Sequence, residues 1–337
     1  MSKATMQDIA DAVGTSRVTV WKAFNNKAGV SQALRQEILE KAKELGYSSQ
    51  RSPGVSPSLP ATKNIAVVVS RPESSRFWMD IIHELAIDFA QRNINLIYSF
   101  VPQSYQAGYV LPKSLTDGSV TGIIVLNVYS ERLLSMLSQL ELPKIFLDTP
   151  PGKTSMELRG DVLMIEGFNT MRQITNRIMS RNVKRLCFIG DIHYAQTNMD
   201  RYQGYLSALR DWGLVPDPRY HLTKRLKFEE HQKEISLFLD SLKQTEDAVI
   251  CASDFLLNFV VQHYNQRKLP TKNIIFSGFD NNLEYPKIAG RYTTAEVNTR
   301  AIGQRLASGI LYRINHPDSP LVTTFIHTKP IYRGSLV

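Results

Sequence analysis

Cysteine is scarce in this sequence of 337 residues, which contains only Cys187 and Cys251. Two cysteines cannot build a disulfide framework, and because both lie inside apolar runs we expect reduced, buried thiols. Long apolar runs are also missing: the longest, such as 65–69, have the length of a strand and not the roughly 18 residues of a membrane helix. The first eight residues have no apolar core and include Asp8, which is not the pattern of a secretory signal. We therefore expect a cytoplasmic protein with no membrane partner.

The composition is that of a folded protein with more than one domain. Apolar residues make up 43% of the chain and charged residues 21%, which permits a large core and is not typical of disorder. A length of 337 residues corresponds to about two to three domains.

Acidic residues are absent from one stretch near the N-terminus. Between Ala12 and Gln36 there are four basic residues and no acid, in a chain whose net charge is +9. A surface that faces DNA phosphates requires such a stretch, because a carboxylate there would be repelled by the DNA backbone. Chance clustering on a solvated surface would give the same count, so charge by itself does not decide the function.

Residues 1–48 have the pattern of three short helices. Apolar residues recur on one face of each, and turn-forming residues separate them. Two short helices joined by a turn that contains glycine are typical of a helix-turn-helix unit. The expected helix starts are a capping-box-like Thr5 for the first helix, Thr15 or Ser16 for the second, and Ser31 for the third.

The chain changes character after Ser48. Residues 49–62 are rich in Pro, Ser and Gly, which is typical of an extended linker and not of a helix. From residue 63 onward, short apolar runs alternate with helical patterns. We therefore expect a headpiece over 1–48, a linker over 49–62 and a core over 63–337.

The core pattern predicts an α/β fold with two doubly wound parallel-sheet lobes, because the segment is too long for one sheet of ordinary size. The expected strands are 65–69, 95–100, 122–126, 144–147, 162–165, 185–189, 248–251 and 273–276. The expected helices include 77–92, 170–180, 202–212, 230–242, 255–266 and 299–313.

The second helix of the headpiece carries the sharpest chemical signal. The DNA major groove admits one helix, whose N-terminal side chains reach the base edges. Arg17 can meet the two acceptors of a guanine with two donors, and Val18 can contact a thymine methyl group. Lys22 can serve a guanine or a phosphate, and short hydroxyl and amide side chains are suited to phosphates. The expected DNA-binding residues are Thr5, Ser16, Arg17, Val18, Thr19, Lys22, Asn25 and Ser31.

The headpiece resembles that of the LacI/GalR repressor family, and the resemblance extends over nearly the whole chain. In the headpiece it rests on residues 5–20, Asn25, Val30-Ser31 and Glu44-Leu45-Gly46-Tyr47, which match without a gap. In the core it rests on residues 185–190, 201–205 and 277–280. The resemblance implies a dimeric transcriptional regulator, whose core clamps a small metabolite between two lobes.

Two features depart from the family pattern. Trp21 occupies a position where the family usually has a small serine that faces phosphate. The linker contains Pro53, Gly54, Pro57 and Pro60, where the family has a short helix that folds on the operator. Because an interior proline costs about 3 kcal/mol in a helix, we expect no regular hinge helix here.

Acidic residues follow several of the expected strands. Asp148, Asp191, Asp254 and Asp280 each come just after a strand. Ligands of open α/β sheets bind at the carboxyl ends of the strands, where carboxylates can accept hydrogen bonds from sugar hydroxyls. An aspartate at such a place is also a common helix N-cap. For Asp191 the N-cap is the favoured interpretation, and for Asp254 the N-cap and the ligand contact are equally supported.

The family resemblance favours the ligand reading for some of these positions. Asp148, Arg201 and Asp280 coincide with positions where the family binds effector sugars, and Ser253 with a frequent polar contact. Phe77 or Trp78 can stack on an apolar sugar face. The family's Asp-Asn pair is absent near Ile165-Glu166, and Arg71 and Arg76 leave an anionic sugar phosphate open as the ligand. The expected effector-binding residues are Phe77, Trp78, Asp148, Arg201, Ser253 and Asp280.

Other chemistries are not supported. Gly152-Lys153-Thr154 lacks the first glycine of a phosphate loop, and no hydrolase elbow or histidine-based metal motif occurs. We expect no enzyme activity, no cofactor and no metal. The sequence predicts a repressor of carbohydrate-utilisation genes that binds a palindromic DNA operator as a homodimer or tetramer, switched by a sugar or sugar phosphate. The alternative is a sugar-binding or sugar-processing α/β protein with an N-terminal extension that does not bind DNA.

Overall fold

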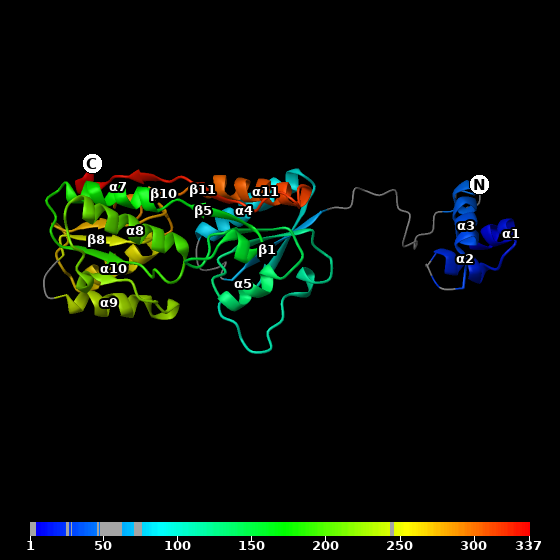
Figure 1. Ribbon diagram of the computed structural model, residues 1–337, viewed down its shortest axis with the longest axis horizontal. Helices are drawn as coiled ribbons and strands as arrows, with labels where there is room; N and C mark the ends of the chain where they lie inside the picture. The colour runs from blue at the N-terminus through cyan, green and yellow to red at the C-terminus, as the bar shows by residue number, and fades with distance from the viewer. Residues whose placement is uncertain are drawn as a thin grey trace. The chain divides into compact units, whose positions relative to one another are not determined.

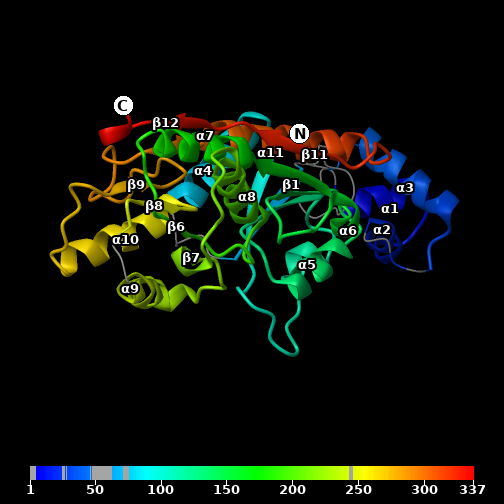
Figure 2. The same cartoon turned by 60° about the vertical axis from the view of Figure 1, so that its left-hand side comes forward.

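The computed structural model describes residues 5–24, 27, 29–45, 47, 63–70, 76–242 and 246–337. The chain separates into two compact units, residues 1–62 and 63–337, and Figures 1 and 2 label most of their elements. The sequence-predicted linker and Asn25 lie outside the described residues.

The first unit is a small three-helix domain, as the sequence predicts. Its helices are α1 (Met6–Val13), α2 (Arg17–Phe24) and α3 (Gln32–Glu44). Thr5 caps α1 in a capping box with Asp8, and Gly14 ends α1 in the left-handed conformation at φ 68°. The core of this unit consists of Ile9, Ala10, Val20, Ala23, Phe24, Ile38 and Ala42.

The second unit begins with a lobe built on a six-stranded sheet. The strands are β1 (Asn64–Val69), β2 (Asn95–Phe100), β3 (Gly122–Leu126), β4 (Lys144–Leu147), β5 (Asp161–Ile165) and β11 (Thr323–Ile326). Their order is β11-β5-β4-β3-β1-β2, and all neighbours are parallel. The helices of this lobe are α4 (Arg76–Gln91), α5 (Glu131–Ser138), α6 (Ser155–Leu158) and α11 (Thr299–Asn315), with a short 3₁₀ turn at Lys113–Leu115.

Strand β1 shows why this lobe has helices on both faces of its sheet. Residues 65–69 are all buried, so both sides of the strand are covered. Ile65, Val67 and Val69 belong to the apolar cluster that contains α4 and α11. The alternate residues Ala66 and Val68 belong to the cluster that contains α5. The unbroken apolar run in the sequence is thus the signature of a doubly covered parallel strand.

The second lobe is built on a four-stranded parallel sheet of order β7-β6-β8-β9. Its strands are β6 (Leu186–Ile189), β7 (His221–Leu222), β8 (Ala248–Cys251) and β9 (Ile275–Ser277), and β10 (Thr294–Glu296) pairs with β12 (Lys329–Ile331) in an antiparallel ribbon. Its helices are α7 (Phe168–Met179), α8 (Gln196–Asp211), α9 (His231–Ser241) and α10 (Asp254–Gln266), with 3₁₀ turns at Pro218–Tyr220, Phe228–Glu230 and Gly334–Leu336.

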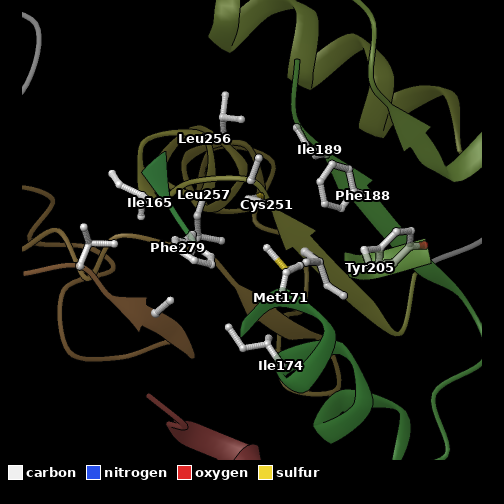
Figure 3. Packing of buried hydrophobic residues seen from close by; sticks show 14 of the residues in the cluster. Ile165, Met171, Ile174, Phe188, Ile189, Tyr205, Cys251, Leu256, Leu257 and Phe279 are labelled. Atoms are coloured by element: carbon white, nitrogen blue, oxygen red, sulfur yellow. The ribbon is translucent and has the colours of Figure 1, made fainter. Parts of the chain in front are cut away.

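The core of the second lobe lies between its sheet and the helices. Figure 3 shows Met171 and Ile174 of α7 on one side, Phe188, Ile189 and Cys251 on the strands, and Leu256 and Leu257 of α10. Both cysteines are buried, as predicted, and burial raises the pKa of each thiol well above its usual range.

The chain passes between the two lobes three times. It leaves the first lobe after β5, returns to it between β10 and α11, and leaves again between β11 and β12. In Figures 1 and 2 the segments from α11 to β12, in orange to red, run along the top of the core and span both lobes. The three crossing segments therefore connect two lobes whose sheets are separate from each other.

Most of the sequence-predicted core elements are confirmed, with two clear errors. Helix α8 begins at Gln196, six residues before the predicted start, and strand β9 begins at Ile275 and not at 273. Residue Ala195 has no side chain that can cap a helix, so sequence offers no start signal there. Strands β7, β10, β11 and β12 are not among the predicted ones.

No helix in the described part of the chain is long and apolar enough to cross a membrane.

Candidate functional site

Helix α2 presents the residues predicted to read DNA. Arg17 and Val18 lie in its first turn and are exposed, Val18 at 61%. On the opposite side, Val20 and Phe24 are buried in the core of the headpiece. Because the buried side fixes the helix, the exposed side is held rigidly for contact with another molecule.

Two hydroxyl groups organise the start of this helix. Ser16 Oγ accepts a hydrogen bond from the backbone N–H of Thr19 at 3.1 Å, so Ser16, and not Thr15, caps α2. The Ser16 and Thr19 hydroxyls lie 2.8 Å apart. The helix has no acid in its first turn. Its N-terminus therefore keeps the partial positive charge that suits a phosphate.

The other residues predicted to contact DNA have partly structural roles. Thr5 and Ser31 are the N-caps of α1 and α3. Lys22 is half-buried in the last turn of α2, and Trp21 is 46% exposed beside it. Trp21 thus presents much of its indole to solvent.

A cavity of about 200 Å³ lies between the two lobes of the core. It is found at the carboxyl ends of the parallel strands, where open α/β sheets bind ligands. All six residues predicted to bind an effector lie on its wall: Phe77, Trp78, Asp148, Arg201, Ser253 and Asp280. The fold thus brings together residues that lie up to 203 positions apart in the sequence.

Arg201 is the central charged residue of this cavity. It is 4% exposed, and its guanidinium lies 3.8 Å from the ring centre of Phe279. One terminal nitrogen donates to the carbonyl of Ala252 at 2.6 Å, and the other donates to Asp280 Oδ1 at 3.0 Å. Its Nε is buried and has no hydrogen-bond partner within the described residues. Since a guanidinium has five N–H donors and these two bonds use two of them, each terminal nitrogen keeps a further N–H.

Asp148 lies at the end of β4, at φ 64°. Its Oδ1 accepts from the backbone N–H groups of Thr149 and Thr197, at 2.8 and 3.3 Å. Its Oδ2 accepts from the hydroxyls of Thr197 and Tyr129, at 2.6 and 3.1 Å. Burial raises the pKa of Asp148, while these hydrogen bonds act in the opposite direction. Since a carboxylate has about four acceptor positions, the chain itself fills them all.

The remaining strand-end acids have different surroundings. Asp191 lines the cavity, but its two oxygens accept from the backbone N–H groups of His193 and Leu226. Asp254 lies outside this cavity and accepts from the Thr294 hydroxyl and the Asn282 N–H. Burial and the nearby Asp280 raise the pKa of Asp254 to about 7. The N-cap of α10 is Ser253, whose Oγ accepts from Leu256.

Aromatic rings line much of the cavity. Phe77 and Trp78, in the first turn of α4, meet edge to face at 5.2 Å. Tyr129 and Tyr194 come from opposite lobes, and their ring centres are 4.4 Å apart. Phe255 adds another ring from α10. Flat aromatic faces are suited to the apolar faces of sugar rings.

The sequence analysis missed several residues of the cavity wall. Tyr129 and Asn127 follow β3 directly, and Tyr194 follows β6 by a few residues. The strand-end argument that selected the acids applies equally to these polar and aromatic residues. Thr197 had no such signal, because the predicted start of its helix was wrong.

The structure gives the surroundings of two further residues that the sequence analysis named, Glu166 and Arg76. Glu166 accepts from the Asn169 N–H at 2.6 Å and from the Thr170 hydroxyl at 3.2 Å, so it stabilises the start of α7. Arg76 lies 3.7 Å from Asp80 and is not on the cavity wall. Arg71 lies outside the described residues.

Two family matches cover most of the chain. Residues 5–50 match the family described as bacterial regulatory proteins, lacI family. Residues 175–336 match the periplasmic binding protein-like domain. The headpiece match contradicts the alternative in which the N-terminal segment has no part in DNA binding.

Relatives and solved structures of the same architecture cover the chain almost fully. The HTH-type transcriptional repressor CytR of Escherichia coli strain K12 is 28% identical over 287 residues, which are 82% of this chain and 80% of that protein. The transcriptional regulator CelR in complex with cellobiose has a TM-score of 0.68 at 21% identity and covers 98% of this chain and 99% of its own. The lac repressor dimer bound to operator and the anti-inducer ONPF has a TM-score of 0.68 at 15% identity, with full coverage of both chains.

The structural similarity confirms the predicted fold, a helix-turn-helix headpiece followed by a two-lobed core. The matched families are regulatory and binding proteins, which agrees with the prediction that this chain is not an enzyme. Since both domains occur in this order in one chain, the protein belongs to the LacI family of bacterial regulatory proteins and is a DNA-binding transcriptional regulator.

Proposed function

We propose that this regulator is a repressor of carbohydrate-utilisation genes that acts in the cytoplasm as a homodimer. The observation that carries the proposal is the exposed, acid-free first turn of α2, held over a buried face in the segment that matches the lacI family. Two-fold pairing of chains presents two such helices, which fit the two halves of a palindromic operator. The lac repressor, a structural relative of this chain, is a dimer on its operator.

In this proposal, α2 reads the bases and the surrounding residues hold the DNA backbone. Arg17 donates two hydrogen bonds to a guanine, and Val18 contacts a thymine methyl group. Lys22 neutralises a phosphate or meets a second base, so its contribution depends on salt. The phosphate contacts come from Thr5, Ser16, Thr19, Asn25 and Ser31.

The cavity between the lobes is the proposed effector site. Aromatic rings on its wall stack on a sugar, Asp280 Oδ2 accepts from a hydroxyl, and the Arg201 guanidinium donates to an oxygen. Ser253 Oγ caps α10 as an acceptor, and its O–H can still donate to an oxygen of the ligand. The relative CelR has been seen with cellobiose, which supports a carbohydrate as the class of ligand.

The effector switches DNA affinity through the three crossing segments, which act as a hinge between the lobes. A ligand shifts an equilibrium only if it binds the two lobe arrangements unequally. A ligand held by residues of both lobes, such as Trp78 and Arg201, has a different contact set in each arrangement. Rotation about the three crossings then changes the distance between the headpieces of a dimer.

Selection of bound duplexes from random DNA tests the proposal. The full-length protein is expected to enrich a palindrome of two half-sites, and a carbohydrate pool is expected to change the yield of that sequence. Failure to enrich any sequence at modest salt, with and without the pool, would refute the DNA-binding function. Enrichment that no carbohydrate alters would refute the effector part alone.

A further inference from the structure

The positive charge of the core is concentrated in two segments of its sequence. Residues 167–190 and 297–337 together contain ten basic residues and one acid, Asp318. The rest of the core, residues 63–166 and 191–296, contains 22 basic and 25 acidic residues. About a quarter of the core therefore carries more than its entire net positive charge, whereas an ordinary solvated surface has both signs interspersed.

The two segments come together on one side of the core. The first contains α7, and the second contains α11, β11 and β12. In Figures 1 and 2 these four elements all lie along the top of the core, α7 over the second lobe and α11 over the first. Arg177 of α7 joins the two segments directly: its Nε donates to the carbonyl of Leu336 at 2.9 Å, and its guanidinium lies 5.7 Å from the ring centre of Tyr332. This side therefore spans both lobes.

Five cations on this side are exposed and form no ion pair with an Asp or Glu side chain of the described residues: Arg177, Arg181, Lys184, Arg305 and Lys329. We refer to these five side chains as the basic face. Glu296 lies opposite Lys329 in the ribbon of β10 and β12, but it forms no ion pair with it in the described structure. Four other arginines of the two segments are already paired with carboxylates: Arg172, Arg185, Arg300 and Arg313.

Exposed aromatic rings accompany these cations. Tyr312 of α11 is 53% exposed, and Phe325 is 54% exposed on β11, the last strand in the order of its sheet. The Tyr312 hydroxyl lies 3.3 Å from Ser319 Oγ, in the segment that leads into β11. Contacts to a DNA backbone come from basic and polar side chains, whereas protein interfaces are enriched in aromatic residues and arginine. Rings beside cations therefore favour a protein over duplex DNA as the partner.

We propose that the basic face is the docking site of a second protein, which presents an acidic segment with apolar side chains among its carboxylates. The carboxylates pair with Arg305, Lys329 and the cations of α7, and the apolar side chains pack on Tyr312 and Phe325. Charge complementarity selects the partner, and the apolar contacts hold it, because exposed ion pairs contribute little by themselves. The inference goes beyond the proposed function, since none of these residues lies in the headpiece or on the cavity wall.

Fluorescence anisotropy on the full-length protein tests the proposal with three synthetic peptides of equal length. In the first peptide, glutamate alternates with leucine and phenylalanine; the second has serine in place of the apolar residues, and the third has lysine in place of glutamate. The first is expected to bind about tenfold more tightly than the second, because it buries apolar surface as well. The third is expected not to bind. Affinity for the first should fall as salt rises, because exposed charges are screened.

An excess of random-sequence duplex DNA is present in every titration. The duplex occupies the headpieces, whose own acid-free stretch would otherwise attract an acidic peptide. Binding of the first peptide is expected to be the same at twice the duplex concentration. Displacement of the peptide by the duplex would show that the basic face is a nucleic-acid surface, which overturns the proposal.

Charge reversal connects the binding to the basic face. Lys184→Glu, Arg305→Glu and Lys329→Glu are combined, because single exposed ion pairs are weak, and are expected to weaken the first peptide about tenfold. If the combined variant does not fold, Arg305→Glu alone is expected to weaken it about twofold. The control combines Lys113→Glu and Lys233→Glu, which reverse one exposed lysine in each lobe outside this side of the core, and is expected to leave the affinity unchanged.

The aromatic part has its own variant. Phe325→Ser is expected to weaken the first peptide several-fold and to leave the serine peptide unaffected. Carbodiimide coupling, which joins peptide carboxylates to lysine amines, is expected to mark Lys184 and Lys329 before Lys113 and Lys233. Equal affinity for the first two peptides, an unaltered affinity after charge reversal, or coupling without preference among these lysines would each overturn the proposal, and operator binding would be untouched.

Discussion

The headpiece and the core place their candidate functional residues in opposite environments. In the headpiece, Arg17 and Val18 are exposed, and the buried residues behind them have no chemical role. In the core, Arg201 and Asp148 are 4% and 7% exposed, so the candidate site and the packing share the same residues. A surface site can therefore change without loss of stability, whereas the core site cannot. The following predictions test that difference.

The largest effect is expected for Arg201→Ala. The substitution leaves Asp280 and the Ala252 carbonyl without their donors in a buried place, which costs about 3–5 kcal/mol of unfolding free energy. Chemical denaturation of the core and titration with the effector measure both consequences. Arg185→Ala is the matched control, because its ion pair with Asp247 is half-exposed, and it is expected to cost less than about 1 kcal/mol. Equal losses for the two variants would contradict the comparison.

The second effect concerns the small core of the headpiece. Ile38 is fully buried there, and Ile38→Ala is expected to cost about 2–5 kcal/mol. A domain of this size has little stability to lose, so DNA binding should disappear while the effector affinity of the core is retained. Leu39→Ala, at an exposed neighbour, is the control. Retained operator binding by Ile38→Ala would show that the headpiece core is more stable than its size implies.

A third, smaller effect is expected at the exposed side of α2. Arg17→Ala should remove about 1–3 kcal/mol of preference at one base pair of each half-site, without a change in thermal stability. Lys22→Ala should weaken all sequences alike and reduce the salt slope by about 1 where Lys22 contacts a phosphate, whereas a base contact would give a loss that depends on sequence. Binding assays on a set of half-site variants separate the two patterns. Arg17→Ala with unaltered base preference would remove Arg17 from the reading face.

The smallest net effect is expected for the pH dependence of core stability, because two buried groups act in opposite directions. His221 lies between two hydroxyls, with Nδ1 3.1 Å from Tyr202 and Nε2 3.0 Å from Tyr205, and burial lowers its pKa to about 4. Between pH 6.5 and 4 the unfolded chain binds a proton that the folded chain refuses. This group therefore stabilises the fold at neutral pH, and the stabilisation is lost as the pH falls through that window.

Asp254 acts in the opposite direction over nearly the same window. Its pKa is raised to about 7, so the folded chain keeps a proton that the unfolded chain releases, and its contribution falls as the pH rises. Thermal unfolding at pH 5 and 7 should show that His221→Gln makes stability fall with rising pH relative to the parent chain. Asp254→Asn should make stability rise with pH relative to the parent. Identical profiles for both variants would contradict these pKa directions.

Local pattern was sufficient for much of the molecule. The helix starts at Thr5 and Ser31 carry hydroxyl caps, and the strand 65–69 is a run of apolar residues, so each is visible in a few consecutive residues. The start of α8 was not visible, because Ala195 cannot cap and the first N–H groups are satisfied by Asp148 and Thr149 from the other lobe. Thr149 accepts from Gln196, 47 positions later, and Asp148 accepts from Thr197, 49 positions later, so no local pattern marks this helix start.

By itself, the sequence determined the three-helix headpiece, the alternating α/β core and the residues that gather at the strand ends. These features follow from short-range periodicity, capping and the rule that parallel strands end on one side of a sheet. Only the tertiary structure decided that Asp148 caps a helix of the opposite lobe and that Arg201 Nε is buried without a partner among the described residues. The physical reason is that hydrogen-bond capacity is a property of completed surroundings, and here the partners come from two lobes that the sequence does not place against each other.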